Sequence, residues 1–177
     1  MKLTDIIRQN REQILANWQG MIFETYSDKA SSFMASGKDK FSNPVGFAIK
    51  ESTTLIFDQL LDGVDLEKLK PAIDNIVRIR SVQEFSSSEA TLFIFLLKQC
   101  IQKALETQDF GKDIYFELNE IYSTIDKISL MAFDIYVECR EMIFEIKANS
   151  VRMRSYKLLE RAISPADQEP KGEERDD

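Results

Sequence analysis

The chain of 177 residues contains no histidine. This absence removes the usual haem ligand, the Glu-x-x-His pattern of di-iron proteins, the common zinc sites and the usual general base. It also excludes a Ser-His-Asp or Cys-His catalytic set. The six glycines are scattered and form no phosphate-binding loop. We therefore expect no cofactor and no enzymatic activity.

Long apolar runs are missing as well. The longest, around Leu92–Leu97, is far shorter than the roughly 20 residues that cross a bilayer. The N-terminus lacks the pattern of a signal peptide. Only two cysteines occur, Cys100 and Cys139, and apolar neighbours at helical spacing predict that both are reduced core residues. These features predict a cytoplasmic protein without a membrane span.

Histidine aside, the chain has fewer bases than acids, 23 against 30. The formal net charge is −7, of which residues 164–177 contribute −4 through six acids and two bases. An acidic protein without a basic groove is a poor nucleic-acid binder, so we expect no nucleic-acid partner. The acidic residues 164–177 are predicted to form a disordered tail.

What the sequence has in abundance is apolar residues at helical spacing. Asn43-Pro44 provides an N-cap and a first-turn proline, and Ser86 with Glu89 fits a capping box. The pattern predicts an all-α helical bundle over residues 1–163. The first expected helix has the face Ile6–Phe23 and ends near Tyr26; a short turn at Asp28–Ala35 and a loop at Ser36–Phe41 follow it. Further helices are expected at Val45–Leu61, Asp65–Arg80, Ser87–Thr107 and about 112–163. Pro71 is expected to kink or restart the second of these.

The last predicted helix is unusually long. Residues 112–163 contain neither glycine nor proline, and a continuous helix of this span would be about 75 Å long. Either this helix breaks or its end projects. Apolar residues recur at spacings of four and three, which is typical of a coiled coil and predicts a homodimer seamed partly by this helix. The row comprises Ile114, Leu118, Ile121, Ile125, Ile128, Ala132, Ile135, Cys139, Met142 and Ile146, and continues through Asn149, Met153, Tyr156 and Ile163.

The end of this helix is basic, because residues 147–161 carry five bases and one acid. Such a segment suits an anionic partner, but a solvated helical face or an oligomer seam is more common.

The connection Arg78–Ala90 alternates long polar side chains with Ile79, Val82 and Phe85. Such a connection is expected to be packed, and its polar groups must then find partners. We predict that Arg78, Arg80 and Gln83 are at least partly buried and hydrogen-bonded.

A row of acids on the last helix, Asp126, Asp134, Glu138 and Glu141, has two interpretations. The spacing gathers carboxylates as a metal site requires, but the lack of histidine argues against a di-iron centre. Alternatively, these acids pair with Arg78, Arg80 and Arg140 across helices, with Asp134 or Glu138 as the partner of the arginines in the connection. We favour the second interpretation.

Aromatic residues are expected mainly in the core, although a pocket for a small apolar ligand between helices is also compatible with them. They are Trp18, Phe23, Phe47, Phe57, Phe93, Phe95, Phe133 and Tyr136.

Three motifs occur in order: Asn43-Pro44-Val45-Gly46, then Arg78–Gln83 with Ser88-Glu89-Ala90, then Phe133–Tyr136 with Cys139-Arg140-Glu141. The set resembles the N-terminal domain family of RsbRD-type RsbT co-antagonist proteins, over roughly Ile6–Arg154. The resemblance implies an all-helical, globin-like, dimeric sensory module in bacterial stress signalling. In the full regulators this module precedes a phosphorylated STAS domain, which we do not expect in this chain.

The sequence therefore predicts a stand-alone sensory or regulatory domain that binds an unidentified regulatory protein or a small ligand. The alternative is a structural, dimerising accessory subunit without a ligand. Candidate residues for a polar cluster or partner site are Asn43, Arg78, Arg80, Gln83, Asp134, Glu138 and Arg140.

Overall fold

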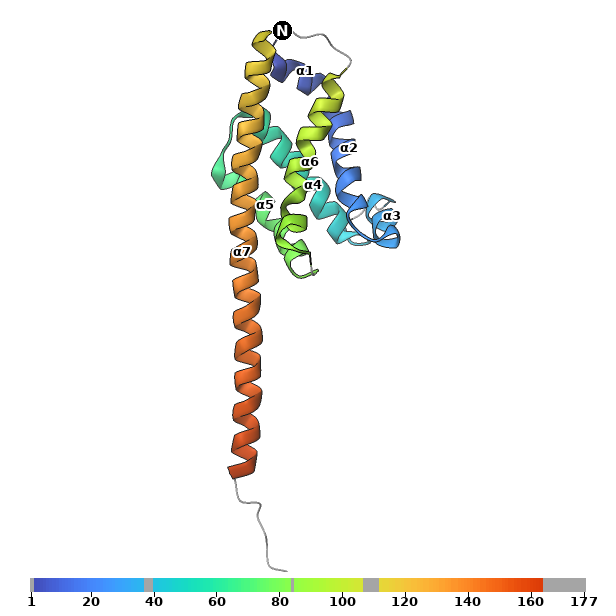
Figure 1. Cartoon of the computed structure of the whole chain (residues 1–177). Coiled ribbons are helices and arrows are strands. Elements are labelled where there is room, and N and C mark those ends of the chain that lie inside the picture. The colour runs from blue at the N-terminus through green and yellow to red at the C-terminus, as the bar shows by residue number, and fades with distance from the viewer. Residues whose placement is uncertain (1, 37–39, 84, 107–111, 164–177) are drawn as a thin grey trace, which may run out of the picture. The chain divides into compact units, whose positions relative to one another are not determined.

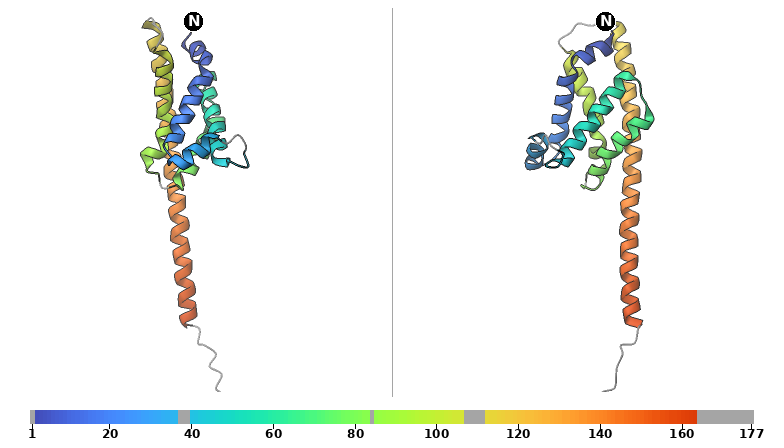
Figure 2. Two further views of the ribbon diagram at one scale, coloured as in Figure 1. Left: turned by 90° about the vertical axis from the view of Figure 1, so that its right-hand side faces the viewer. Right: turned by 180° about the vertical axis from the view of Figure 1, so that it is seen from behind.

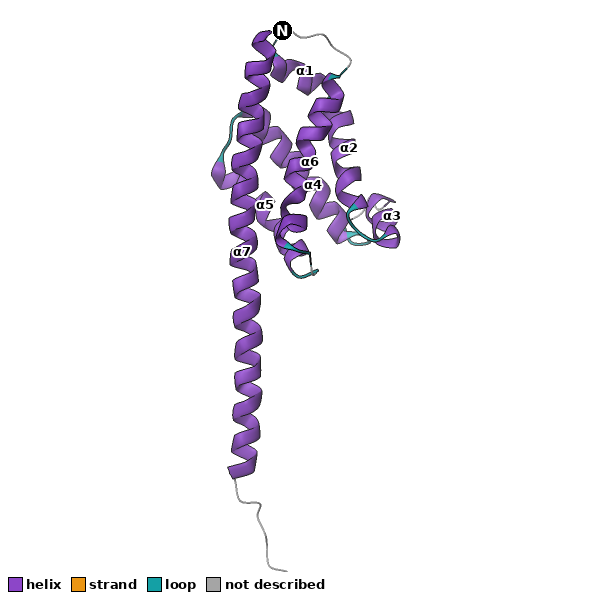
Figure 3. Ribbon diagram, in the orientation of Figure 1, coloured by secondary structure: helices purple, strands orange, loops and turns teal. Residues whose placement is uncertain are grey.

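The computed structural model describes residues 2–36, 40–83, 85–106 and 112–163. Within these ranges the chain forms helices and no strand, as predicted (Figure 1, Figure 3). The helices are α1 Leu3–Gln9, α2 Arg11–Glu24, α3 Asp28–Ser36, α4 Pro44–Asp62, α5 Leu66–Ser81, α6 Ser87–Leu105 and α7 Lys112–Ile163. The all-α class and the long last helix are thereby confirmed, whereas the predicted tail at 164–177 lies outside the described residues.

The chain divides into two compact units, Met1–Arg140 and Glu141–Asp177. Unit 1 contains α1 to α6 and the part of α7 up to Arg140, and it holds the hydrophobic core. In unit 2 the described residues are the remainder of α7, from Glu141 to Ile163.

Helix starts follow the predicted caps. The Asn43 side chain accepts a hydrogen bond from the Gly46 backbone N–H, with Pro44 in the first turn of α4. Ser86 and Glu89 form the capping box of α6. The prediction of a single first helix was wrong, because the segment divides at Asn10 into α1 and α2. The Asn10 amide donates to the Ile6 carbonyl oxygen at 2.9 Å, so a side chain competes with the backbone at this point and the helix is interrupted.

In unit 1, α4 packs mainly against α5 and α2 mainly against α6 (Figure 2). The Trp18 indole N–H of α2 donates to the Phe93 carbonyl oxygen of α6 at 2.5 Å, which satisfies its only donor in the interior. Among the predicted core aromatics, Phe47 is half-buried and five are buried: Trp18, Phe23, Phe57, Phe93 and Tyr136. Phe95 and Phe133 are exposed, so the prediction that they lie in the core was wrong. Phe95 belongs to the apolar run of α6, one side of which faces solvent.

The apolar row of α7 has two environments. Ile121, Ile125, Ile128, Ala132, Ile135 and Cys139 are buried in the core of unit 1. The later members of the row in unit 2, such as Met142, Ile146 and Met153, are exposed. Up to Cys139, the predicted seam therefore packs against the other helices of unit 1 of the same chain.

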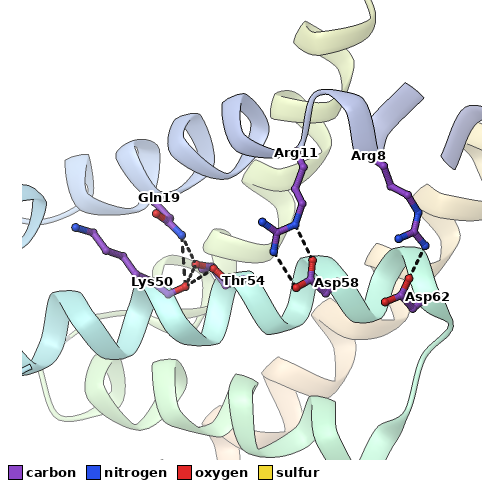
Figure 4. A network of polar contacts seen from close by, with 8 residues as sticks. Arg8, Arg11, Gln19, Lys50, Thr54, Asp58 and Asp62 are labelled. Atoms are coloured by element: carbon purple, nitrogen blue, oxygen red, sulfur yellow. Dashed lines mark hydrogen bonds and ion pairs between the residues drawn. The ribbon is translucent and has the colours of Figure 1, made fainter. Parts of the chain in front are cut away.

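Ion pairs connect α1 and α2 to α4 on the surface of unit 1 (Figure 4). Arg11 donates from Nε and Nη2 to the two carboxylate oxygens of Asp58 at 2.9 and 2.8 Å, and Arg8 pairs with Asp62. The hydrogen bond to Asp58 raises the pKa of Arg11. Further along α2, the Gln19 amide donates to the Thr53 hydroxyl and to the Lys50 carbonyl oxygen. This row of contacts sets how α2 lies against α4.

Both cysteines are free and buried, as predicted. The Cys100 thiol donates to the Met21 sulfur at 3.6 Å, and burial raises its pKa from 9.0 to about 11. Burial also raises the pKa of Cys139.

We expect the native protein to react slowly through Cys100 with an aromatic disulfide reagent at pH 8. A pKa of about 11 lowers the thiolate fraction about 100-fold, and the higher nucleophilicity of such a thiolate recovers only about tenfold. A Cys139→Ser variant isolates the reaction. Its rate in the native state should be at least about tenfold below its rate in denaturant; equal rates would show that Cys100 is not buried in solution.

Candidate functional site

Arg80 lies in the last turn of α5 and is fully buried, with 0 % of its surface exposed. Its Nη1 donates to the Glu89 carbonyl oxygen of α6 at 2.8 Å. Its Nη2 donates to the Thr25 hydroxyl at 2.5 Å and to the Ile22 carbonyl oxygen at 3.4 Å, both near the end of α2. One guanidinium group thus connects the ends of α2 and α5 with the start of α6.

Three aromatic rings surround the same guanidinium. Its Cζ lies 5.2 Å from the ring centre of Tyr26, 4.8 Å from Phe85 and 5.8 Å from Phe93. The Tyr26 and Phe85 rings meet edge to face. The negative faces of these rings and the carbonyl oxygens at the end of α2 partly replace the water that a cation loses on burial.

Burial dominates the electrostatics of this pair. It lowers the pKa of Arg80 and raises the pKa of the Tyr26 phenol, while each group opposes the shift of the other. Among the described residues, the Nε of Arg80 and the hydroxyl of Tyr26 have no hydrogen-bond partner. A buried cation held by neutral groups is costly, so its partners must be well placed.

Glu89 binds Arg80 through its backbone, while its carboxylate is occupied elsewhere. The Glu89 carboxylate accepts from the Ser86 backbone N–H at 2.9 Å and from the Ser86 hydroxyl at 2.7 Å, which lowers the pKa of Glu89. Its backbone carbonyl, rather than its carboxylate, binds Arg80. Within the described ranges Arg80 makes no ion pair.

Helix α7 holds the same connection from its other side. The Tyr136 hydroxyl donates to the Phe85 carbonyl oxygen at 2.8 Å, and Arg140 Nη1 donates to the Ser81 carbonyl oxygen at 3.2 Å. The α5–α6 connection is therefore anchored by Arg80 from within the bundle and by two side chains of α7. Four helices of unit 1 meet at this point.

The predicted pairing of the arginines with Asp134 or Glu138 was wrong. Arg78 is exposed and pairs with Asp74, one turn earlier on its own helix, at 2.6 Å. Gln83 is exposed too, so burial was predicted correctly for Arg80 alone. The error arose because backbone carbonyls and rings, which the side-chain pattern does not show, serve as the partners of Arg80.

The two predicted acids are exposed on α7. Glu138 lines an open groove of about 690 Å³ beside α5, together with Leu66, Glu67, Lys70, Pro71, Asp74 and Arg78. Five of these seven residues carry a charged group. Asp134 makes no ion pair within the described part of the chain.

Asn43 is buried at a separate place and has a structural task. Its amide donates to the carbonyl oxygens of Phe33 at 3.2 Å and Met34 at 2.9 Å, while its Oδ1 accepts from the Gly46 N–H at 2.9 Å. It joins the end of α3 to the start of α4. Of the seven candidate residues, the structure brings Arg80 and Arg140 to one connection and places Asn43 elsewhere.

The sequence pattern did not predict the roles of Thr25, Tyr26 and Tyr136 in this site. A hydroxyl residue and a tyrosine directly after the last turn of α2 were the available signal, since caps of this kind bind polar groups. Among the described residues no group of three acids or cysteines could hold a metal ion. No described helix combines the length and the apolar character required to cross a membrane.

The fold and the site define a class: an all-helical module whose polar centre joins helices to one another. The model of one protein family, described as RsbT co-antagonist protein rsbRD N-terminal domain, matches residues 12–151, and the chain belongs to this family. It is thus a sensory or regulatory domain of the RsbT co-antagonist type. No curated protein and no solved structure matches the chain significantly, so a globin-like arrangement stays a prediction.

Proposed function

We propose that this domain regulates another protein by binding it, and that it does so in the cytoplasm as a cofactor-free homodimer without enzymatic activity. The observation that carries the proposal is a second apolar row on α7 in unit 1. Leu130, Phe133 and Val137 are 67 %, 45 % and 37 % exposed. Leu130 and Val137 each lie two residues after a buried isoleucine. Two residues correspond to a rotation of about 200° about the helix axis. The row therefore lies away from the core.

Such a row is a suitable dimer surface, because large apolar side chains at spacings of three and four otherwise remain in water. It differs from the seam that the sequence predicts, whose members up to Cys139 are committed to the core. A second copy of the chain would cover Leu130, Phe133 and Val137 with the same residues.

The α5–α6 connection supplies a means of regulation. Because Arg80 binds α2 and α6, and Tyr136 and Arg140 bind the same connection from α7, a shift of any of these helices strains the others. A signal or partner that moves one of these helix ends would therefore shift the position of α7 within unit 1.

The dimer is tested by light scattering at micromolar concentration, where the chain should show about twice its mass of 20.5 kDa. Leu130→Asp should weaken the dimer at least about tenfold, because it places a carboxylate in an apolar interface. Leu66→Asp is the matched control, since Leu66 is a similarly exposed leucine of α5 outside the row. A chain that is monomeric at every concentration, or equal effects of both variants, would contradict the proposal.

Co-purification with mass spectrometry of bound proteins and small molecules then distinguishes a regulatory domain from a structural accessory subunit. A regulatory domain should retain a protein partner or a small molecule. A dimer that retains neither a protein nor a small molecule is expected for the accessory subunit instead.

A further inference from the structure

The described part of unit 2 is a helix with an apolar row that nothing within it covers. Phe144, Val151 and Leu158 follow one another at intervals of seven residues and are 73 %, 62 % and 65 % exposed. An interval of seven residues keeps side chains on one side of a helix and is the repeat of helix-to-helix seams. Ala148 and Ser155 lie between them at spacings of four and three, so small residues alternate with large ones along this row.

A basic row accompanies the apolar one. Lys147, Arg154 and Arg161 also follow at intervals of seven, each three residues after a member of the apolar row, and all three are exposed. Within the described residues none of them makes an ion pair. The other flank, one residue after each member of the apolar row, is mixed and consists of Glu145, Arg152 and Leu159. Residues in these flanking positions face a partner helix and select it by charge.

We propose that this face of unit 2, Phe144–Leu158 with its basic flank, binds an acidic amphipathic helix of a partner protein. Apolar residues of that helix cover Phe144, Val151 and Leu158, and its carboxylates face Lys147, Arg154 and Arg161. The inference rests on the proposed function, since it states the chemistry of the protein that the domain binds.

A second copy of the chain matches the charges of this face only in part. In a parallel pair in register, a flanking residue faces the one five positions later, which places Lys147 opposite Arg152 of the other copy but Arg140 opposite Glu145. An antiparallel pair brings the basic flanks together instead. An acidic helix places a carboxylate opposite each of these bases in either direction.

The chain's own acidic end is a poor occupant as well. Residues 164–177 have the right sign of charge, but Ala166 is the one apolar residue apart from prolines and glycine among them. They offer no large apolar side chain for the row of Phe144, Val151 and Leu158.

The test uses the whole chain and a fluorescent synthetic peptide of about three heptads, with leucine at the seam positions and glutamate at the flanks. Fluorescence anisotropy measures its binding against two other probes: a peptide with lysine at the flanks, and polyglutamate of the same length. The acidic heptad peptide should bind at least about tenfold more tightly than either. Equal binding of polyglutamate would overturn the proposal in favour of attraction by charge alone.

Variants of exposed residues then locate the site. Val151→Asp should weaken binding at least about tenfold, and Arg154→Glu at least about fivefold, since each breaks one of the two rows. Lys157→Glu is the matched control, because it changes the net charge equally on the side away from the seam and should alter binding less than about twofold. The triple variant Lys147→Glu, Arg154→Glu, Arg161→Glu should prefer the lysine peptide. Equal effects of Arg154→Glu and Lys157→Glu would overturn the inference.

Light scattering of the same samples keeps this inference apart from the proposed dimer. Loss of the dimer in Leu130→Asp with peptide binding unchanged supports both proposals. Absence of peptide binding while Val151→Asp turns a dimer into a monomer would show that a second copy occupies this face, and the acidic partner would be withdrawn.

Discussion

Arg80→Ala is expected to lower the free energy of unfolding by about 3–5 kcal/mol. The change removes charge-assisted hydrogen bonds to Thr25 and Glu89, worth about 1.5–3 kcal/mol each in typical cases, and contacts with three aromatic rings. It also leaves a cavity among buried side chains. The variant also removes the cost of burying the Arg80 cation, and this gain offsets part of the lost free energy. Denaturant unfolding measures the difference.

Arg80→Met separates the charge from the cavity. Methionine fills much of the space but neither donates hydrogen bonds nor carries charge, so we expect a loss of about 1–4 kcal/mol. Arg78→Met is the control, because Arg78 is exposed on the same helix and makes one ion pair within it; its change should stay within about 0.5 kcal/mol. A stabilised Arg80→Met variant would mean that the cost of burying the cation outweighs its bonds, and that the connection is not held as described.

Gly46→Ala is expected to destabilise the protein by about 2–4 kcal/mol. A Cβ atom at this position would lie 2.4 Å from Nδ2 of Asn43 and 2.7 Å from the Met34 carbonyl oxygen. Both atoms belong to the contact that joins α3 to α4, and the carbonyl is backbone, so a methyl group must displace the helix end and break the Asn43 cap. Thermal or denaturant unfolding measures the loss.

Gly20→Ala is the matched control for this prediction, since it is the same substitution in another helix. Nothing lies within 4 Å of a Cβ at Gly20, which occupies the interior of α2. Alanine there should raise stability by about 0.5–1 kcal/mol through its higher helix propensity. Opposite signs of the two effects are the expected result; similar effects would show that the close approach at Gly46 does not exist in solution.

The helices were predictable because their signals are local. Asn43-Pro44 and Ser86 with Glu89 start α4 and α6 where their caps indicate, and the lack of glycine and proline in residues 112–163 matches α7. The missed boundary at Asn10 depends on a side chain that shares a carbonyl with the backbone and leaves no periodic signal. The segment predicted as a short turn at Asp28–Ala35 is the helix α3.

The site was only partly predictable. An arginine inside the packed connection Arg78–Ala90 pointed to a buried polar group, and Arg80 is that group. Its partners are backbone carbonyls of α2 and α6, the Thr25 hydroxyl just after α2, and ring faces from α6 and from the segments that follow α2 and α5. Because every residue has a carbonyl, sequence spacing cannot select which ones meet a guanidinium, and the carboxylates of α7 were the more visible but wrong choice.

By itself, the sequence determined the helical class, the starts of α4 and α6, the free buried cysteines and the family resemblance, since these depend on local patterns and residue types. Tertiary structure alone decided which of the two apolar rows of α7 enters the core, because both have the spacing of a helix seam and only the packing of α7 in unit 1 chooses between them. It likewise decided that the partners of Arg80 among the described residues are neutral groups, since the ends of α2, α5 and α6 meet only in the folded chain.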